Sequence, residues 1–210
     1  MMKVIIHNAI GIDGRNIGLN IDLESFFDQD LHYHEDVVLV NIETISKIEM
    51  KLDGSGEFYV PNMIQDDKRP ALAVVDDSGM VRCWKALMES GYWKEYYAII
   101  TKQTNHDYVS KLVKKGIQPI VAGEKKVDMK HVIEILDKEL GFEMCRLDPS
   151  GELNSAMLDL DLVDEVSLVV IPMMSDSNDE AFAISKRMKH FKFLEGKSLE
   201  NGVVWLRYRK

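Results

Sequence analysis

Hydrophobic residues in this chain gather in short runs that are almost continuously apolar and rich in β-branched side chains. Runs of this kind, bounded by polar or glycine-containing segments, are typical of strands that are buried on both faces of a sheet. The pattern predicts strands over residues 2–10, 36–41, 71–77, 96–101, 118–123, 143–148 and 166–174. Two further runs, 190–196 and 202–209, have no helical segment between them and predict an antiparallel hairpin at a sheet edge.

Helical segments with recognisable ends lie between some of these runs. Each begins after a side chain that can cap a helix and ends at a glycine. The cap, helix and glycine are Asn105, 106–115 and Gly116 in one case, and Asp128, 129–140 and Gly141 in the other. Strand and helix therefore alternate from about residue 96 to 174, which predicts βαβ crossovers and parallel strands.

Three segments complete the expected organisation. A helix is expected over residues 21–34, and another is expected to start within the stretch LDPSGELN, residues 147–154. Residues 51–70 are the most loop-like part of the chain and predict an excursion over the surface or a lid. We expect a single domain over residues 1–210.

The charge balance and the cysteine count exclude several classes of protein. The 26 basic and 35 acidic side chains give a net charge of −9 without a basic patch, which argues against nucleic acid as a partner. Cys83 and Cys145 are too few for a disulfide framework. The apolar run at the N-terminus is too short for a signal peptide or a membrane span, so a cytoplasmic protein without a membrane partner is expected.

Several motifs carry a family resemblance. They are HNAIGIDGR (7–15), DVVLVNIET (36–44), PALAVVDDSG (70–79) and LDPSGELNSAMLDLDLVDEVSLVVIP (147–172). In this order they resemble the riboflavin-biosynthesis pyrimidine reductases, the C-terminal domain of the bifunctional deaminase/reductase and relatives of dihydrofolate reductase. The resemblance implies an α/β protein with a three-layer α/β/α dihydrofolate-reductase-like domain and a central mixed, mostly parallel sheet. It also implies NADPH at the C-terminal strand ends, a homodimer, and a ribosylamino pyrimidinone phosphate as the substrate, reduced at the sugar.

The same resemblance implies the site residues. Ala9 would face the nicotinamide through its backbone, Asp13 and Gly14 would shape the loop over the site, and Thr44 would lie between cofactor and substrate. The expected catalytic residues are Asp13, Thr44 and Asp148. The expected cofactor-binding residues are Ala9, Gly14, Thr44, Ser78, Thr101, Gly123, Ser150, Gly151 and Leu153. No metal site is expected, because His32 and His34 would point in nearly opposite directions on a helix.

The chain departs from the family at several of these positions. Gly11 stands where the family usually has serine, and Pro149 and Ser150 stand where it has the first two glycines of its pyrophosphate turn. Ser150 is a good N-cap, and Glu152 in the first helical turn opposes an incoming anion. Asp76 and Asp77 precede Ser78 and would repel a 2′-phosphate unless a base such as Arg82 offsets them.

These residue types also have purely structural interpretations. Asp-Gly at 13–14 is a favourable turn, Thr44 can be a helix cap, and Ser78, Thr101 and Gly123 can belong to ordinary strand-end loops. Three functions therefore remain open: an NADPH-dependent pyrimidine reductase, a degenerate reductase-fold protein for ligand binding or assembly, and a dihydrofolate reductase proper. The motifs favour the first.

Overall fold

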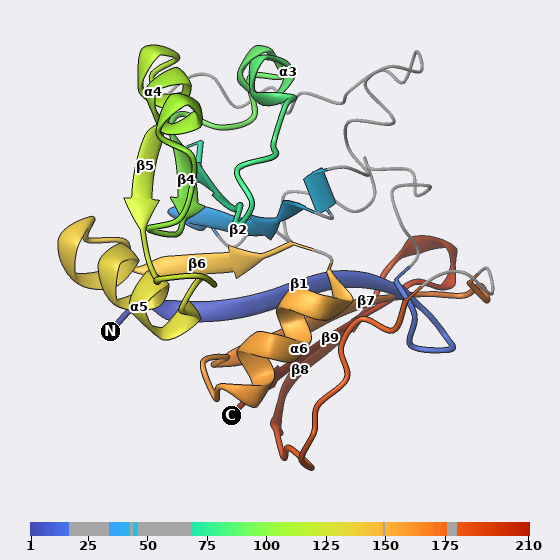
Figure 1. Cartoon of the computed structure of the whole chain (residues 1–210). Helices are drawn as coiled ribbons and strands as arrows, with labels where there is room; N and C mark the ends of the chain where they lie inside the picture. Colours follow the sequence, from blue (N-terminus) through green and yellow to red (C-terminus); the bar gives the residue numbers. More distant parts are fainter. Residues whose placement is uncertain (17–33, 43, 46–68, 149, 176–179) are drawn as a thin grey trace. The chain divides into compact units, whose positions relative to one another are not determined.

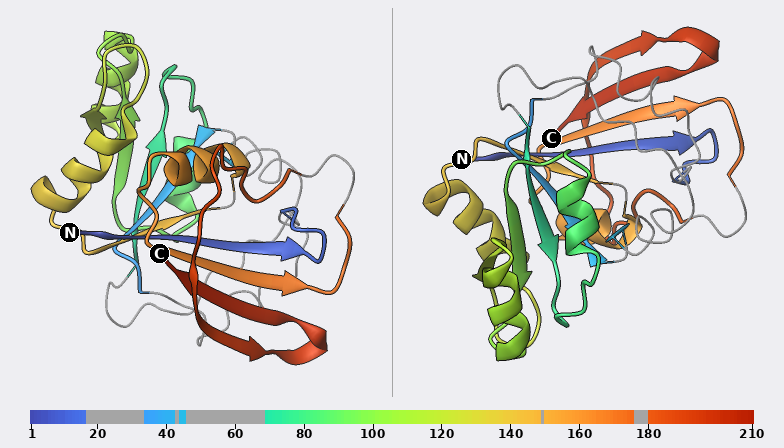
Figure 2. Two further views of the ribbon diagram at one scale, coloured as in Figure 1. Left: turned by 90° about the horizontal axis from the view of Figure 1, so that it is seen from below. Right: turned by 90° about the horizontal axis from the view of Figure 1, so that it is seen from above.

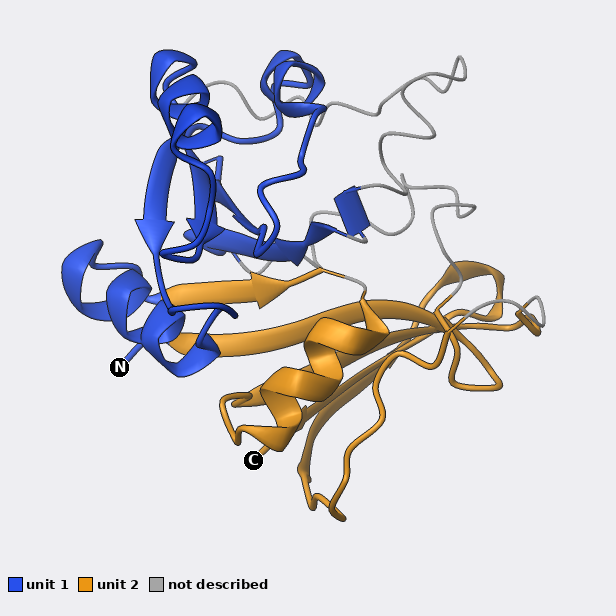
Figure 3. Cartoon of the chain, viewed as in Figure 1, with its two compact units in different colours: residues 1–2, 34–143 blue, residues 3–33, 144–210 orange. Residues whose placement is uncertain are grey.

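The computed structural model describes residues 1–16, 34–42, 44–45, 69–148, 150–175 and 180–210 (Figure 1). The chain divides into two compact units (Figure 3). Unit 1 contains Met1–Met2 and His34–Glu143, and unit 2 contains Lys3–Tyr33 and Met144–Lys210. Residues 21–33 of the expected helix and 51–68 of the expected loop lie outside the described residues, and His34, with a φ of +51°, is not helical. The single domain over residues 1–210 stays a prediction.

Unit 1 contains four parallel strands with helices between them. The strands are β2 (Val37–Asn41), β3 (Ala71–Val75), β4 (Tyr96–Ile100) and β5 (Gln118–Val121), in the spatial order β5-β4-β3-β2. The helices are α3 (Trp84–Glu89), α4 (His106–Lys114) and α5 (Met129–Glu134), which continues into a π-helical turn, η2 (Ile135–Glu139). Because the strands are parallel, their carboxyl ends and the loops that follow them meet at one edge of the sheet.

The helix ends confirm the predicted caps. The Asn105 carboxamide oxygen accepts hydrogen bonds from the amides of Asp107 at 2.7 Å and Tyr108 at 3.4 Å. The Asp128 carboxylate accepts from the amides of Lys130 and His131, at 3.0 and 3.4 Å. The two glycines that follow these helices both have positive φ angles, as C-terminal glycines require.

The short helix α3 was not predicted from the pattern. It has six residues, and its N-cap, Cys83, makes no side-chain capping hydrogen bond. It is stabilised by packing instead, since Trp84 and Leu87 lie in the buried core of unit 1. A helix that depends on tertiary burial leaves little local signal.

Unit 2 contains five strands and one longer helix. In spatial order, the strands are β6 (Met144–Leu147), β1 (Lys3–Gly11), β7 (Glu165–Ile171), β9 (Val204–Arg209) and β8 (Lys192–Ser198). β1 is parallel to β6 and β7, whereas β9 is antiparallel to β7 and β8. The predicted edge hairpin is therefore confirmed, and both views of Figure 2 show β8 and β9 beside β7. Helix α6 (Gly151–Asp159) follows β6, and a 3₁₀ turn, η3 (Glu200–Gly202), joins β8 to β9.

Two ion pairs to one buried carboxylate connect β7 to its neighbouring strands within unit 2. Glu165 is 1% exposed, and its carboxylate accepts hydrogen bonds from Lys3 Nζ at 2.6 Å and from Arg207 Nε at 2.7 Å. Two cations, one from β1 and one from β9, therefore pair with one acid on the strand between them.

The α/β class with a mixed, mostly parallel sheet is confirmed by the strand pairings of the two units. Among the described residues no helix is both long and apolar enough to cross a membrane.

Candidate active site

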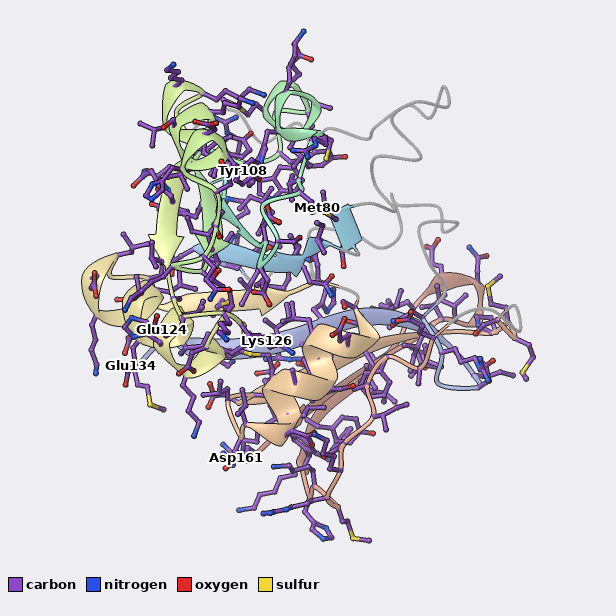
Figure 4. The ribbon with its side chains drawn as sticks, viewed as in Figure 1. Met80, Tyr108, Glu124, Lys126, Glu134 and Asp161 are labelled. Carbon is purple, nitrogen blue, oxygen red and sulfur yellow. The ribbon has the colours of Figure 1, made fainter. Side chains whose placement is uncertain are left out.

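The loop after β3 is organised by a buried carboxylate. Asp76 is fully buried and accepts hydrogen bonds from the amides of Met80 at 2.9 Å and Val81 at 3.3 Å. It also accepts from the Tyr108 hydroxyl at 2.6 Å, and Trp84 Nε1 donates to that hydroxyl at 3.0 Å. Burial, together with the hydrogen bond to Asp76, raises the pKa of Tyr108, which therefore stays a neutral donor. Figure 4 labels Tyr108 and Met80.

The two acids before Ser78 are thus engaged by the protein itself. Asp76 points into the core of unit 1, and the Asp77 carboxylate accepts from the Val127 amide at 3.0 Å. Ser78 and Arg82 remain exposed on the same loop. Asp76 is therefore turned away from solvent, and Asp77 is bonded to the neighbouring loop.

The loops after β4 and β5 lie next to each other. The Thr101 amide donates to the Thr104 hydroxyl at 3.1 Å, and the Lys102 amide donates to the Gly123 carbonyl at 3.0 Å. Gly123 has φ +140°, and a Cβ placed there would lie 2.1 Å from the Lys126 carbonyl oxygen. Glycine is therefore required for this turn. Glu124 and Lys126, labelled in Figure 4, are exposed on the loop that it begins.

Thr44 lies on the short turn after β2 and is 9% exposed. Its amide donates to Asn41 Oδ1 at 3.0 Å and its hydroxyl donates to the same atom at 3.1 Å. Asn41, rather than Thr44, is therefore the capping residue of this turn.

The end of β1 carries the motif residues of unit 2. Ala9 is 6% exposed, pairs with Val169 of β7, and packs with Val169 and Trp205. After the strand, the Gly14 amide donates to the Gly11 carbonyl at 3.0 Å, and Gly14 has φ +76°, so the predicted turn is present. The Asp13 carboxylate accepts from the Ser175 hydroxyl at 2.8 Å, and this hydrogen bond is the main cause that lowers the pKa of Asp13.

The start of α6 is closed by protein groups. Ser150, which is 2% exposed, is the N-cap that the sequence predicts, and its hydroxyl accepts from the Leu153 amide at 3.2 Å. A Cβ on Gly151 would lie 2.5 Å from the Ala181 carbonyl oxygen and 3.2 Å from Glu180 Oε2. Segment 180–182 therefore lies directly against the first residue of this helix.

Asp148, the third expected catalytic residue, pairs with Arg146 of β6 through a short contact between Oδ1 and Nη1. Both side chains are mostly buried, with exposed fractions of 17% for Asp148 and 13% for Arg146. The acid is therefore accompanied by a cation on the same strand end.

A chain of buried asparagines links these parts of unit 2. Asn8 donates to Asn16 Oδ1 at 2.8 Å, and Asn154 Nδ2 donates to the Phe182 carbonyl at 2.9 Å and to Asn8 Oδ1 at 3.5 Å. Among the described residues Asn154 Oδ1 has no partner. The network connects β1, the turn after it, α6 and the segment around residue 182.

The structure thus groups the expected residues in two sets. In unit 1, the loops of Ser78, Thr101 and Gly123 are joined by backbone and carboxylate hydrogen bonds. In unit 2, segment 180–182 contacts both the Gly14 turn, through Phe182, and the start of α6 at Gly151. Three contributors were not predicted as site residues, namely Asn41, Ser175 and Glu180. Their partners lie far away in sequence or depend on side-chain orientation, so only Asn41, three residues before Thr44, has a local signal as a cap.

The described residues contain no group of three or more histidine, cysteine or acidic side chains arranged to hold a metal ion. The arrangement is that of an α/β fold with polar loops at the carboxyl ends of parallel strands. A profile of the RibD C-terminal domain family matches residues 3–204. The chain therefore belongs to the RibD C-terminal domain family, the reductase family that its motifs resemble.

Solved structures agree with this fold. A pyrimidine reductase-like protein from Corynebacterium diphtheriae superposes with a TM-score of 0.71 at 16% identity, covering 99% of this chain and 91% of that one. RibD from Acinetobacter baumannii gives 0.74 at 16% identity, and the match covers 100% of this chain but 58% of RibD. A dihydrofolate reductase from Enterococcus faecalis gives 0.55 at 7% identity, covering 99% and 95% of the two chains. The dihydrofolate-reductase-like fold is confirmed.

Proposed function

We propose that this chain is an NADPH-dependent reductase of a ribosylamino pyrimidinone phosphate of the riboflavin-biosynthesis type. The observation that carries the proposal is the family match over residues 3–204, which includes every motif residue assigned to the site. The name of the Corynebacterium neighbour, a pyrimidine reductase-like protein, agrees with this substrate class.

The two units differ in how well their residues suit the cofactor. In unit 1, the exposed Ser78 and Arg82 offer a hydroxyl and a guanidinium, which are suitable donors for a 2′-phosphate. Lys126 adds a further cation on the neighbouring loop. In unit 2, the start of α6 does not suit a pyrophosphate as it stands, because Ser150 occupies the Leu153 amide and Ala181 covers Gly151. The donors for the cofactor's phosphates therefore come from unit 1 in this proposal.

Asp13 would act as an ionised hydrogen-bond acceptor rather than as an acid. Hydrogen bonds from Ser175 lower the pKa of this carboxyl, so it is charged at neutral pH. A carboxylate can accept from a sugar hydroxyl and stabilise the positive charge that the reacting carbon carries before the hydride reaches it. NADPH, when bound, would supply the hydride that reduces this carbon, the bond from the carbon to the ring oxygen would break, and that oxygen would take a proton from water.

Thr44 in unit 1 and Asp148 in unit 2 are each assigned a polar contact to a ligand, as the family resemblance implies. The Thr44 hydroxyl donates a hydrogen bond to Asn41 Oδ1, so its oxygen lone pairs can accept a hydrogen bond from a ligand. Asp148 is paired with Arg146, so we assign it as an acceptor that orients a donor group of the substrate. These residues orient the substrate, and none of them needs to move a proton for the assigned role.

A second candidate is a reductase-fold protein that binds a ligand or assembles without using NADPH. The observation that favours it is the closed start of α6, where the Ala181 carbonyl fills the space beside Gly151. The two candidates differ in one measurable property, which is the affinity for NADPH.

A fluorescence titration with NADPH and with NADH tests the proposal. We expect saturable binding with a preference for NADPH, and Arg82→Gln should weaken NADPH binding about tenfold or more. The reason is that a hydrogen bond to a charged group contributes about 1.5 to 3 kcal/mol. NADH affinity should be unchanged, since it lacks the 2′-phosphate. The matched control is Arg187→Gln, which changes an exposed arginine of unit 2, whereas Arg82 belongs to unit 1. Absence of saturable NADPH binding to the unaltered chain would favour the second candidate.

We also propose a homodimer, as the family resemblance implies. Light scattering on the purified protein should then give the mass of two 24.0 kDa chains across a tenfold dilution. A mass that corresponds to one chain at every concentration contradicts this proposal.

A further inference from the structure

One residue supplies two hydrogen-bond donors to the Asp13 carboxylate. The Ser175 hydroxyl donates to Asp13 Oδ1 at 2.8 Å, and the Ser175 amide donates to Oδ2 at 3.3 Å. Donors to both oxygens restrict rotation of the carboxylate as well as its position. The two residues are separated by 162 positions in the sequence, and the Ile12 amide joins their segments by donating to the Met173 carbonyl at 3.0 Å.

Gly11 provides the space for this arrangement. Its φ is not in the left-handed region, so backbone conformation does not require a glycine. A Cβ at this position would lie 2.6 Å from Asp13 Oδ1, 2.8 Å from the Met173 carbonyl oxygen and 3.1 Å from Ser175 Oγ. Any side chain at position 11 would therefore displace the carboxylate or the hydroxyl that holds it.

The nearby cation contributes less to the position of Asp13. Arg15 Nε lies 4.0 Å from Asp13 Oδ2, and the Arg15 side chain is 44% exposed. The Arg15 amide reaches Oδ1 only at 3.5 Å. The Asp13 side chain is 16% exposed, although the residue as a whole lies at the surface of the turn.

We propose that Ser175 is a positioning residue for Asp13 in the reductase reaction. We also propose that position 11 is a glycine because any side chain there would displace the hydrogen-bonded pair of Asp13 and Ser175. The inference rests on the proposed function, in which Asp13 accepts a hydrogen bond from the substrate. Ser175 acts through Asp13 and does not itself touch the reacting atoms.

The test measures the pKa of Asp13 by carbon-13 NMR in the intact chain, with Asp13→Asn used to assign the signal. Ser175 donates to the charged form of Asp13, so its hydroxyl lowers this pKa and Ser175→Ala should raise it. Ser175→Thr keeps the hydroxyl and should restore the lower pKa. Gly11→Ala should also raise the pKa although Ser175 is intact, because the added carbon displaces the carboxylate.

Kinetics supply the second measurement. With the pyrimidine substrate, Ser175→Ala should lower kcat/KM about tenfold to a hundredfold, the range expected when a group that orients the substrate is misplaced. The Kd for NADPH should stay the same, and Ser175→Thr should recover most of the rate.

Ser185→Ala is the matched control. The Ser185 hydroxyl donates to Asp159 Oδ1 at 3.2 Å at another place in unit 2, so its loss should alter Asp159 and leave the Asp13 signal and the rate unchanged. An unchanged pKa of Asp13 in Ser175→Ala overturns the proposal, as does a raised pKa with an unchanged kcat/KM. If the unaltered chain neither binds NADPH nor turns over substrate, the proposed function fails and the role of Ser175 in that reaction fails with it. The comparison of pKa values then still decides whether Ser175 positions Asp13.

Discussion

Asp76→Ala should lower the free energy of unfolding by about 3 to 5 kcal/mol, since each buried donor left without a partner costs about 1 to 3 kcal/mol. Three donors lose their acceptor, namely the amides of Met80 and Val81 and the hydroxyl of Tyr108. The cost is less than three independent losses, because the Tyr108 hydroxyl can keep its weaker hydrogen bond to the Val81 carbonyl at 3.4 Å. Urea denaturation followed by circular dichroism measures the change.

Two variants show whether burial is the cause. Asp128→Ala removes an exposed acid that also accepts two backbone amides, and it should cost only about 1 kcal/mol, the usual value for a helix cap. Tyr108→Phe keeps the buried carboxylate and its backbone donors, so it should fall between the two. If Asp76→Ala costs no more than Asp128→Ala, the buried network does not hold this loop. The same loop carries Ser78 and Arg82, so the loss of stability should be accompanied by weaker NADPH binding under the proposed function.

Local patterns predicted the strands and most helix ends because these features depend on neighbouring residues. Each β-branched run became a strand within a few residues of its expected bounds, and Asn105, Asp128 and Ser150 cap the helices that follow them. Helix α3 was missed because its stability comes from burying Trp84 and Leu87 rather than from a cap.

The candidate site was predictable only in part for the same reason. The resemblance placed Asp13 at the end of β1 and Ser78 after β3, and the structure has them there. The partner of Asp13, Ser175, is brought to it by the pairing of β1 with β7, and the partner of Asp76, Tyr108, is brought to it by the packing of α4. Contacts between residues far apart in sequence follow from strand register and helix packing, which a single sequence does not display.

Gly123→Ala should be as damaging as Asp76→Ala, with an expected cost of about 3 kcal/mol or more from backbone strain and overpacking together. The substituted Cβ would lie 2.1 Å from the Lys126 carbonyl oxygen and 3.2 Å from the Asp128 amide nitrogen, and both are backbone atoms that cannot rotate away. The φ of +140° is also a conformation that side chains rarely adopt. Thermal unfolding measures the stability, and the NADPH titration measures the effect on binding.

Gly116→Ala separates the two causes. Gly116 also has a positive φ, +79°, but among the described residues no atom lies within 4 Å of the position that a Cβ would take there, so only backbone strain of about 1 to 2 kcal/mol applies. Rearrangement of the 122–128 loop would break the hydrogen bonds from the Lys102 amide to Gly123 and from the Val127 amide to Asp77. NADPH affinity should therefore fall in Gly123→Ala and not in Gly116→Ala. Equal losses of stability in the two variants would mean that the close approach to Lys126 does not shape the loop. An unchanged NADPH affinity in Gly123→Ala would remove this loop from the proposed cofactor site.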